Sequence, residues 1–224
     1  ANRQKDQFLA MLAHELRNPL APITTAAQLL QRGQMDAPGI QRASDIIARQ
    51  AQHMTSLVND LLDVSRVTRG LVTITKEALE MREIVHEAVE QVRPLIDARG
   101  HALHCEIAAG PLPVEGDRTR LIQVVSNILN NAAKYTAVGG SLVLSARSES
   151  GWVRVAVRDN GQGIDPQILP YIFDLFIQAE RTPDRSQGGL GLGLALVKSL
   201  VALHGGRVAA YSERPNRGSE VVIR

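Results

Sequence analysis

Three polar residues on one predicted helix have the types and the spacing to hold a metal ion and phosphates. Asn127 and Asn131 are four residues apart, and Lys134 follows one turn later. Amide oxygens suit a hard cation such as Mg²⁺ that is bound through substrate phosphates, and a lysine ammonium supplies a compact positive charge. Asn130 lies on nearly the same side, and spacing does not separate it from the others. The same row would also suit an ordinary solvated helix face.

Two glycine-rich segments also have the chemistry of a nucleotide site. In the first, residues 159–164, Gly161 and Gly163 allow a tight turn after a predicted strand, and the Asp159 carboxylate can accept a hydrogen bond from an exocyclic amine. The second, residues 188–194, opens a predicted helix, so its amides and the helix N-terminus favour an anion. It is not a Walker A motif, and no strand leads into it as a dinucleotide fingerprint requires.

The glycines of the second segment follow a polar stretch, residues 178–187. Such a stretch beside an anion site is typical of a loop that closes over a bound ligand. We therefore expect a mobile lid over the nucleotide.

The pair His14-Glu15 lies on the first predicted helix, near its apolar stripe. The stripe consists of residues spaced three and four apart: Leu12, Leu16, Leu20, Ile23, Ala27 and Leu30. His14 is two residues from both Leu12 and Leu16, so we expect it to point away from the buried seam, toward solvent or another domain. Asn18 shares its face. The helix by itself does not separate a functional histidine from a solvated one.

Apolar spacing divides the chain near residue 70. Before that point the pattern predicts helices over residues 6–31 and about 40–64, and Pro19 predicts a bend one turn after His14. Two amphipathic helices bury one seam poorly when alone, so we expect a second copy to complete a four-helix bundle. The alternative is that both helices pack only on the domain that follows.

After residue 70, helical and strand patterns are interspersed. We predict helices over 81–98, 121–132 and 192–203, and strands over 71–75, 101–107, 141–147, 153–158, 207–211 and 220–223. The runs 141–147 and 153–158 have the spacing of a hairpin. Interspersed elements with a mostly antiparallel sheet predict an α+β two-layer sandwich. The expected domains are residues 1–69 and 70–224.

Composition excludes several classes of function. The net charge of +2 over 224 residues is too small to predict a nucleic-acid surface. A single cysteine, Cys105, allows no intrachain disulfide, which fits a reducing compartment. No apolar run approaches the ~18 residues that span a bilayer, so we expect no direct membrane contact in this segment. The chain begins and ends within a pattern, which suggests a piece of a longer protein.

Five motifs in one order resemble those of the histidine kinases of two-component signalling, over essentially the whole chain. They are FLAMLAHELRNPL (H box), NILNNAAKYT (N box), DNGQGI (first glycine box), FDLFIQ (F box) and GGLGLGLALVKSL (second glycine box). The resemblance implies a dimeric four-helix bundle followed by a Bergerat-type ATP-binding domain. It also implies a cytoplasmic segment, which is compatible with a membrane-anchored full-length protein. Two positions depart from the pattern: Asn130 stands where the family often has serine, and Leu190 where threonine is commoner.

The resemblance also implies roles for individual residues. His14 would be the phospho-acceptor, Glu15 would accept or orient the imidazole proton, and Asn18 would orient water for dephosphorylation of a partner. Asn127 and Asn131 would hold Mg²⁺ with ATP. The rest of the implied ATP site comprises Lys134, Tyr135, Asp159, Gly161, Gly163, Ile164, Gly189, Leu190, Gly191, Leu192 and Gly193. The implied reaction is ATP-dependent phosphorylation of His14, then transfer to an aspartate of a response-regulator receiver domain, with dephosphorylation of that receiver as a further activity.

Three other functions can be weighed against this one. Chaperone, gyrase and mismatch-repair ATPases share the nucleotide fold, but they carry a water-activating glutamate where this chain has Asn127. A non-catalytic dimerisation module would not need intact glycine boxes. A zinc protease with the HExxH motif would need histidine where Asn18 stands.

Overall fold

The computed structural model describes residues 2–33, 35–175, 177, 191–213 and 217–224. Among these, residues 2–11, 14, 60, 67 and 68 are described by their backbone alone. None of the described helices is both long and apolar enough to cross a membrane.

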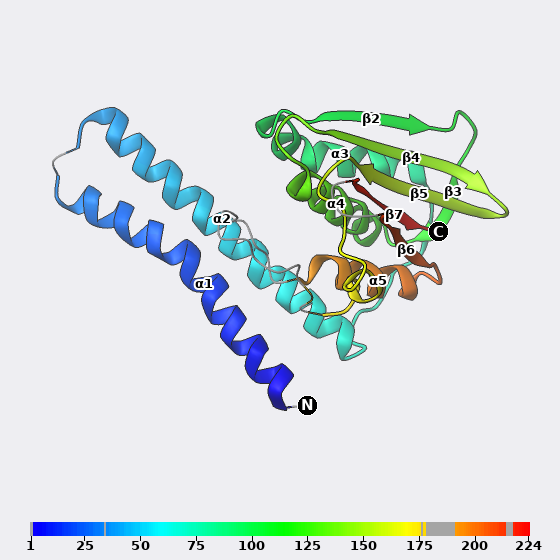
Figure 1. Cartoon of the computed structure of the whole chain (residues 1–224), viewed down its shortest axis with the longest axis horizontal. Coiled ribbons are helices and arrows are strands. Elements are labelled where there is room, and N and C mark those ends of the chain that lie inside the picture. The colour runs from blue at the N-terminus through cyan, green and yellow to red at the C-terminus, as the bar shows by residue number, and fades with distance from the viewer. Residues whose placement is uncertain (1, 34, 176, 178–190, 214–216) are drawn as a thin grey trace.

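The chain begins with a helical hairpin, α1 (Asn2–Gln31) and α2 (Ala37–Thr68), as predicted. The helices run antiparallel, so the N-terminal half of α1 lies beside the C-terminal half of α2 (Figure 1). Helix α1 continues through Pro19 and Pro22. A proline inside a helix removes one backbone hydrogen bond, and the neighbouring residues keep the helical path here.

The buried face of α1 differs from the predicted stripe. Glu15, Pro19 and Ala26 are buried, whereas Leu20 is 45% exposed. The apolar positions of α1 form a band wider than one partner helix can cover, so α2 covers only one side of it. The apolar residues of α2 that recur every three or four positions mostly face the interior: Ala43, Leu57 and Val64 are buried, whereas Ile40 is exposed.

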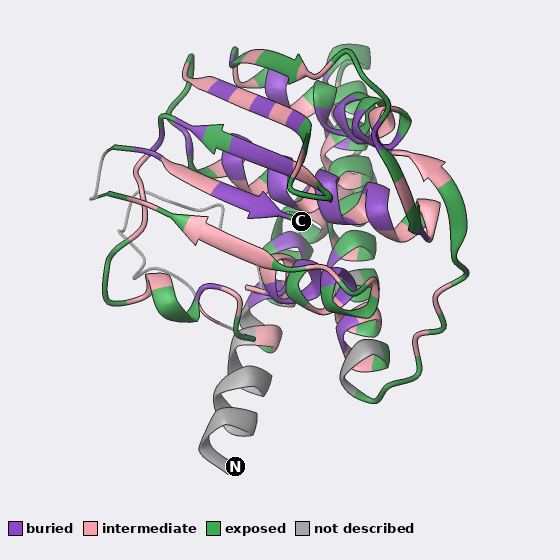
Figure 2. Cartoon of the chain, turned by 90° about the vertical axis from the view of Figure 1, so that its right-hand side faces the viewer, coloured by how far each residue is buried: buried purple, intermediate pink, exposed green. Residues whose placement is uncertain are grey.

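The rest of the chain is an α+β two-layer sandwich, as predicted. Its main sheet has the order β2-β4-β5-β7-β6 and is antiparallel except for the parallel pair β2–β4. The strands are β2 (Ala102–Ile107), β4 (Ser141–Glu149), β5 (Trp152–Asp159), β6 (Val208–Tyr211) and β7 (Ser219–Ile223). Helices α3 (Met81–Ala98), α4 (Arg118–Tyr135) and α5 (Gly193–Leu203) pack against one face. Figure 2 shows the buried residues gathered where these helices meet the sheet.

The strand predicted over residues 71–75 is wrong. These residues are irregular, and the chain enters a small two-stranded sheet only at β1 (Glu77–Glu80), which pairs with β3 (Pro113–Gly116). Alternation is present in 71–75, but none of the described strands pairs with this segment, and Leu71 is 66% exposed. The Thr75 amide instead donates to the Asp117 carboxylate, 3.3 Å away.

Candidate nucleotide and phospho-acceptor site

Helix α4 positions the predicted metal and phosphate ligands opposite its buried face. Its apolar side is buried against the sheet and α3, and its N-terminus is capped by the Asp117 side chain, which accepts from the Arg120 amide at 3.1 Å. Asn127 is half-buried, and its amide nitrogen has no hydrogen-bond partner among the described residues. A buried amide without a partner is costly, so the structure leaves Asn127 ready to bind a ligand.

Asn127 and Asn130 line a cleft of about 670 Å³ between α2 and α4. The wall from α2 includes Asn59, Leu62 and Arg66. The cleft is open and polar, so the first part of the N box remains accessible in a folded chain.

Asn131 brings α4 close to the second glycine box. Its amide nitrogen lies 3.7 Å from the position that a Cβ on Gly193 would occupy, at the start of α5. Gly191 has a φ of +66°, which favours glycine, and Leu192 is buried. The structure therefore brings together the N-box asparagine and the N-terminus of α5. Gly189, Leu190 and the predicted lid over 178–187 lie outside the described residues.

Asp159 ends β5 with its carboxylate held on both oxygens. Oδ1 accepts from the Gly161 amide at 2.8 Å, and Oδ2 accepts from the Ser219 hydroxyl at 2.6 Å. A Cβ on Gly161 would stand 2.5 Å from the Tyr135 carbonyl oxygen, so only glycine fits there. A Cβ on Gly218 would overlap the Asp159 carbonyl group. Each carboxylate oxygen has a second lone pair, so Asp159 can still accept from a ligand amine.

The first glycine box is tied to the N box through Tyr135. The Tyr135 carbonyl accepts from the Gln162 amide at 3.2 Å, while its ring is partly exposed. Gly163 has a φ of +69°, and the Ile164 amide donates to the Ser212 hydroxyl at 2.9 Å. The N box and the first glycine box therefore meet at the C-terminal end of α4.

The H box approaches this site through Glu15. Burial lowers the pKa of the Lys134 ammonium, the nearby Glu15 carboxylate opposes that change, and Arg99 adds to it. Glu15 is buried, whereas Asn18 is exposed. The backbone of His14 lies in α1, and the predicted direction of its side chain lies outside what the structure describes. Glu15 and Lys134 are therefore electrostatic neighbours across the two parts of the chain.

Comparison with known proteins assigns both parts to families. The model described as "His Kinase A (phospho-acceptor) domain" matches residues 4–70, and that described as "Histidine kinase-, DNA gyrase B-, and HSP90-like ATPase" matches residues 116–224. The chain belongs to the histidine kinases. The phospho-acceptor match precedes the ATPase match, and the two together span most of the chain.

Relatives of this histidine kinase are longer proteins. The alginate biosynthesis sensor protein KinB of Pseudomonas aeruginosa is 34% identical over 97% of this chain, which spans 36% of that relative. The autoinducer 2 sensor kinase/phosphatase LuxQ of Vibrio vulnificus is 34% identical over 94% of this chain, which spans 25% of it. The crystal structure of full-length ShkA in complex with AMPPNP is 28% identical, with a TM-score of 0.71 over 97% of this chain and 45% of that one.

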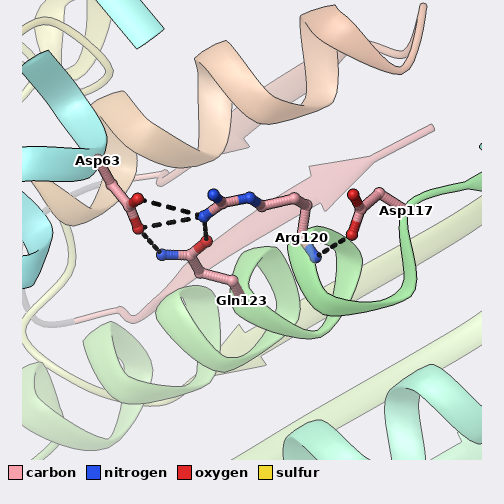
Figure 3. A network of polar contacts seen from close by, with 4 residues as sticks. All are labelled: Asp63, Asp117, Arg120 and Gln123. Atoms are coloured by element: carbon pink, nitrogen blue, oxygen red, sulfur yellow. Dashed lines mark hydrogen bonds and ion pairs between the residues drawn. The ribbon is translucent and has the colours of Figure 1, made fainter. Parts of the chain in front are cut away.

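A polar network joins the hairpin of this histidine kinase to its ATPase domain (Figure 3). The Arg120 guanidinium of α4 lies 3.2 Å from both carboxylate oxygens of Asp63 on α2. Gln123 donates to Asp63 at 2.6 Å and accepts from Arg120 at 2.9 Å. All three side chains are partly buried, so water screens this network less than a surface ion pair.

Leu57 and Val64 of α2 belong to the same apolar core as α4 and α5. The docked arrangement therefore combines apolar burial with directed hydrogen bonds. Sequence analysis did not single out Asp63, Arg120 or Gln123, because residues 57 positions apart carry no spacing signal.

Replacing Asp63 with alanine is expected to lower the rate of the His14 phosphorylation proposed below by up to about 10- to 100-fold, because Arg120 loses a charge-assisted contact worth about 1.5–3 kcal/mol. ATP affinity should fall by a smaller factor than the rate, since Asp63 is distant from Asp159, although it borders the cleft that contains Asn127. The exchange of charges in the double variant Asp63→Arg, Arg120→Asp should recover part of the rate. An Asp63→Ala rate equal to or above that of the wild type would contradict this role.

Proposed function

We propose that this chain transfers the γ-phosphoryl group of ATP to His14. The observation that carries the proposal is the packing of the H box beside the N-box helix: Leu12 lies against the apolar core that contains Ile128 of α4, and the Glu15 carboxylate raises the pKa of Lys134 against the effect of burial. A nucleophile in the H box and a phosphate-binding lysine in the N box must come together for in-line transfer. The domain division near residue 70 belongs to this proposal, and the matches over 4–70 and 116–224 support it.

Different residues of the proposed nucleotide site bind the adenine end and the phosphate end of ATP. The Asp159 carboxylate, already oriented by Gly161 and Ser219, accepts from the adenine amine. Gly191, Leu192 and Gly193 open α5, whose N-terminal amides favour the phosphates. Lys134 adds a positive charge for the phosphates. Tyr135 and Ile164 border the pocket. We also assign Gly163, Gly189 and Leu190 to it.

Asn127 and Asn131 are the residues that would hold Mg²⁺ together with the phosphates. The oxygen-donor chemistry of both side chains fits such an ion. The unpartnered Nδ2 of Asn127 is a hydrogen-bond donor, so it fits a phosphate oxygen beside the ion. When bound, Mg²⁺ would neutralise charge on the phosphate oxygens.

In the transfer step, the neutral imidazole of His14 forms a bond to the γ-phosphorus as the bond to the ADP oxygen breaks. ADP leaves with the electron pair of that bond, and Glu15 accepts or orients the imidazole proton. The phosphoryl group then passes to an aspartate of a response-regulator receiver domain, which docks on the helical hairpin. Because ATP is the proposed substrate, we assign this segment to the cytoplasm.

Asn18 is proposed to act in the reverse direction. It is exposed one turn after His14, where its amide can orient water toward a phosphorylated receiver. The name of LuxQ as a kinase/phosphatase supports an activity of this kind.

The hairpin is proposed to form a homodimer. Leu20 and Leu29 of α1 and Val58 of α2 are each more than 40% exposed in the single chain. A second hairpin would bury these side chains in a four-helix bundle.

ATP hydrolysis is the competing reaction on the same fold. The position that carries the water-activating glutamate in such hydrolases is Asn127 here, which cannot act as a base. The test is the fate of the γ-phosphate with Mg²⁺ present: phosphohistidine on the protein supports the proposal, and free phosphate without it supports hydrolysis.

A further inference from the structure

Four arginines lie next to one another across four strands of the main sheet. Arg147 on β4 is opposite Arg154 on β5. The β5–β7 register, in which Val155 is opposite Ile223, continues to Arg154 opposite Arg224. Arg224 and Arg207 then exchange both backbone hydrogen bonds, at 2.8 and 2.9 Å. We call Arg147, Arg154, Arg224 and Arg207 the arginine row.

The arginine row is on the open face of the sheet. Leu142, Leu144 and Ala146 point to the helix-covered face and are fully buried, so the alternate positions of β4, including Arg147, point the other way. The same alternation puts Trp152 and Tyr211 on the open face, 45% and 54% exposed. Asp159 is at the far end of β5, so the row is separate from the proposed nucleotide site.

The positive charge of the row is only partly balanced. Glu149 faces Arg147, Arg154 and Arg224 at 3.6, 3.6 and 3.8 Å, and its Oε2 accepts no hydrogen bond among the described residues. Glu220 forms an ion pair with Arg154, at 3.2 Å. Four arginines against two glutamates leave a side-chain charge of +2. Like charges opposite one another destabilise a sheet, so the row is costly for folding alone.

The row ends in a hollow with an aromatic wall. A pocket of about 380 Å³ is lined by Glu149, Ser150, Trp152, Arg207 and Arg224. The side chains of Arg147 and Arg224 are 55% and 47% exposed, so their guanidinium groups can reach a ligand. Tryptophan, tyrosine and arginine are the residue types that dominate the binding energy of protein interfaces.

We propose that the arginine row and Trp152 form a docking surface for an acidic segment of another protein. Three interstrand spacings give the row a length of about 14 Å, which exceeds a single phosphate and suits several separated carboxylates. The exposed guanidinium groups of Arg147, Arg207 and Arg224 can each bind a carboxylate through two parallel hydrogen bonds, whereas Arg154 is held by Glu149 and Glu220. Glu149 and Glu220 interrupt the positive charge and would repel the continuous backbone of a nucleic acid, so an acidic peptide is the better fit.

Trp152 is the one tryptophan of the chain, so its fluorescence reports on this surface directly. The probe is a peptide of alternating glutamate and serine, titrated into the whole chain at low salt. We expect a saturable change in Trp152 emission that weakens with added salt. Arg224→Glu should reduce the affinity at least about tenfold, because it replaces attraction by repulsion beside Glu149.

The matched control is Arg93→Glu, the same change of charge at an exposed position of α3 in the helix layer. It should leave peptide affinity within about twofold of the wild type. Arg207→Ala supplies a second variant in case Arg224→Glu does not fold, as judged by circular dichroism. No saturable change, an equal loss with Arg93→Glu, or preferential binding of a single-stranded oligonucleotide would overturn the proposal.

Discussion

Replacing Glu15 with glutamine is expected to lower the rate of phosphohistidine formation by about 100- to 10,000-fold, the range for loss of a positioned general base. Glutamine keeps the size of the side chain but cannot accept the imidazole proton. ATP should still bind with nearly wild-type affinity, because Asp159 and the glycine boxes are unchanged. The measurements are single-turnover phosphorylation with labelled ATP and nucleotide binding by calorimetry.

Glu15 is also buried, at 3% exposure, so a structural contribution must be separated from a chemical one. A structural role would appear as a lower Tm and a weaker dimer in both Glu15→Gln and Glu15→Ala. The matched control is Asn18→Ala, which alters an exposed side chain one turn away and should retain phosphorylation while losing phosphatase activity. Glu15→Gln with a wild-type rate would contradict the assignment of the proton to Glu15.

Replacing Asp159 with asparagine is expected to raise the Kd for ATP by about 10- to 100-fold, since a hydrogen bond to a charged group is worth about 1.5–3 kcal/mol. The wild type should also prefer ATP to inosine triphosphate, which lacks the adenine amine, and Asp159→Asn should lose that preference. Calorimetry with both nucleotides measures the two effects.

Ser219→Ala is the control for this experiment, because it removes the hydroxyl that donates to Asp159 Oδ2 without removing the carboxylate. It should weaken ATP binding much less than Asp159→Asn and keep the preference for ATP. Unchanged discrimination in Asp159→Asn would show that another group reads the base.

Sequence patterns predicted most of the helical elements because their signals are local. The helix over residues 81–98 matches α3 at both ends, since an apolar stripe of threes and fours runs between Met81 and the glycine after Arg99. On the helix over residues 121–132, the apolar residues Val124, Val125 and Leu129 are buried, whereas Asn127 and Asn131 are only partly buried.

Features that depend on neighbours distant in sequence were missed. The Ser219 hydroxyl reaches the Asp159 carboxylate only because β7 lies beside β5 in the sheet, although the two residues are 60 positions apart along the chain. The buried face of α1 was misjudged because the sequence does not say which side of a broad apolar band α2 covers. The contacts of Asp63 with Arg120 and Gln123 also join residues distant in sequence, so sequence patterns do not predict them.

The central claim is that His14 receives the γ-phosphate of ATP. The measurement is incubation of the chain with γ-labelled ATP and Mg²⁺, next to a His14→Gln variant, followed by acid and alkali treatment of the labelled protein. We predict label on the wild type alone, lost in acid and retained in alkali, as expected for a phosphorylated imidazole. Equal labelling of His14→Gln, or release of all label as free phosphate from the wild type, would contradict the claim.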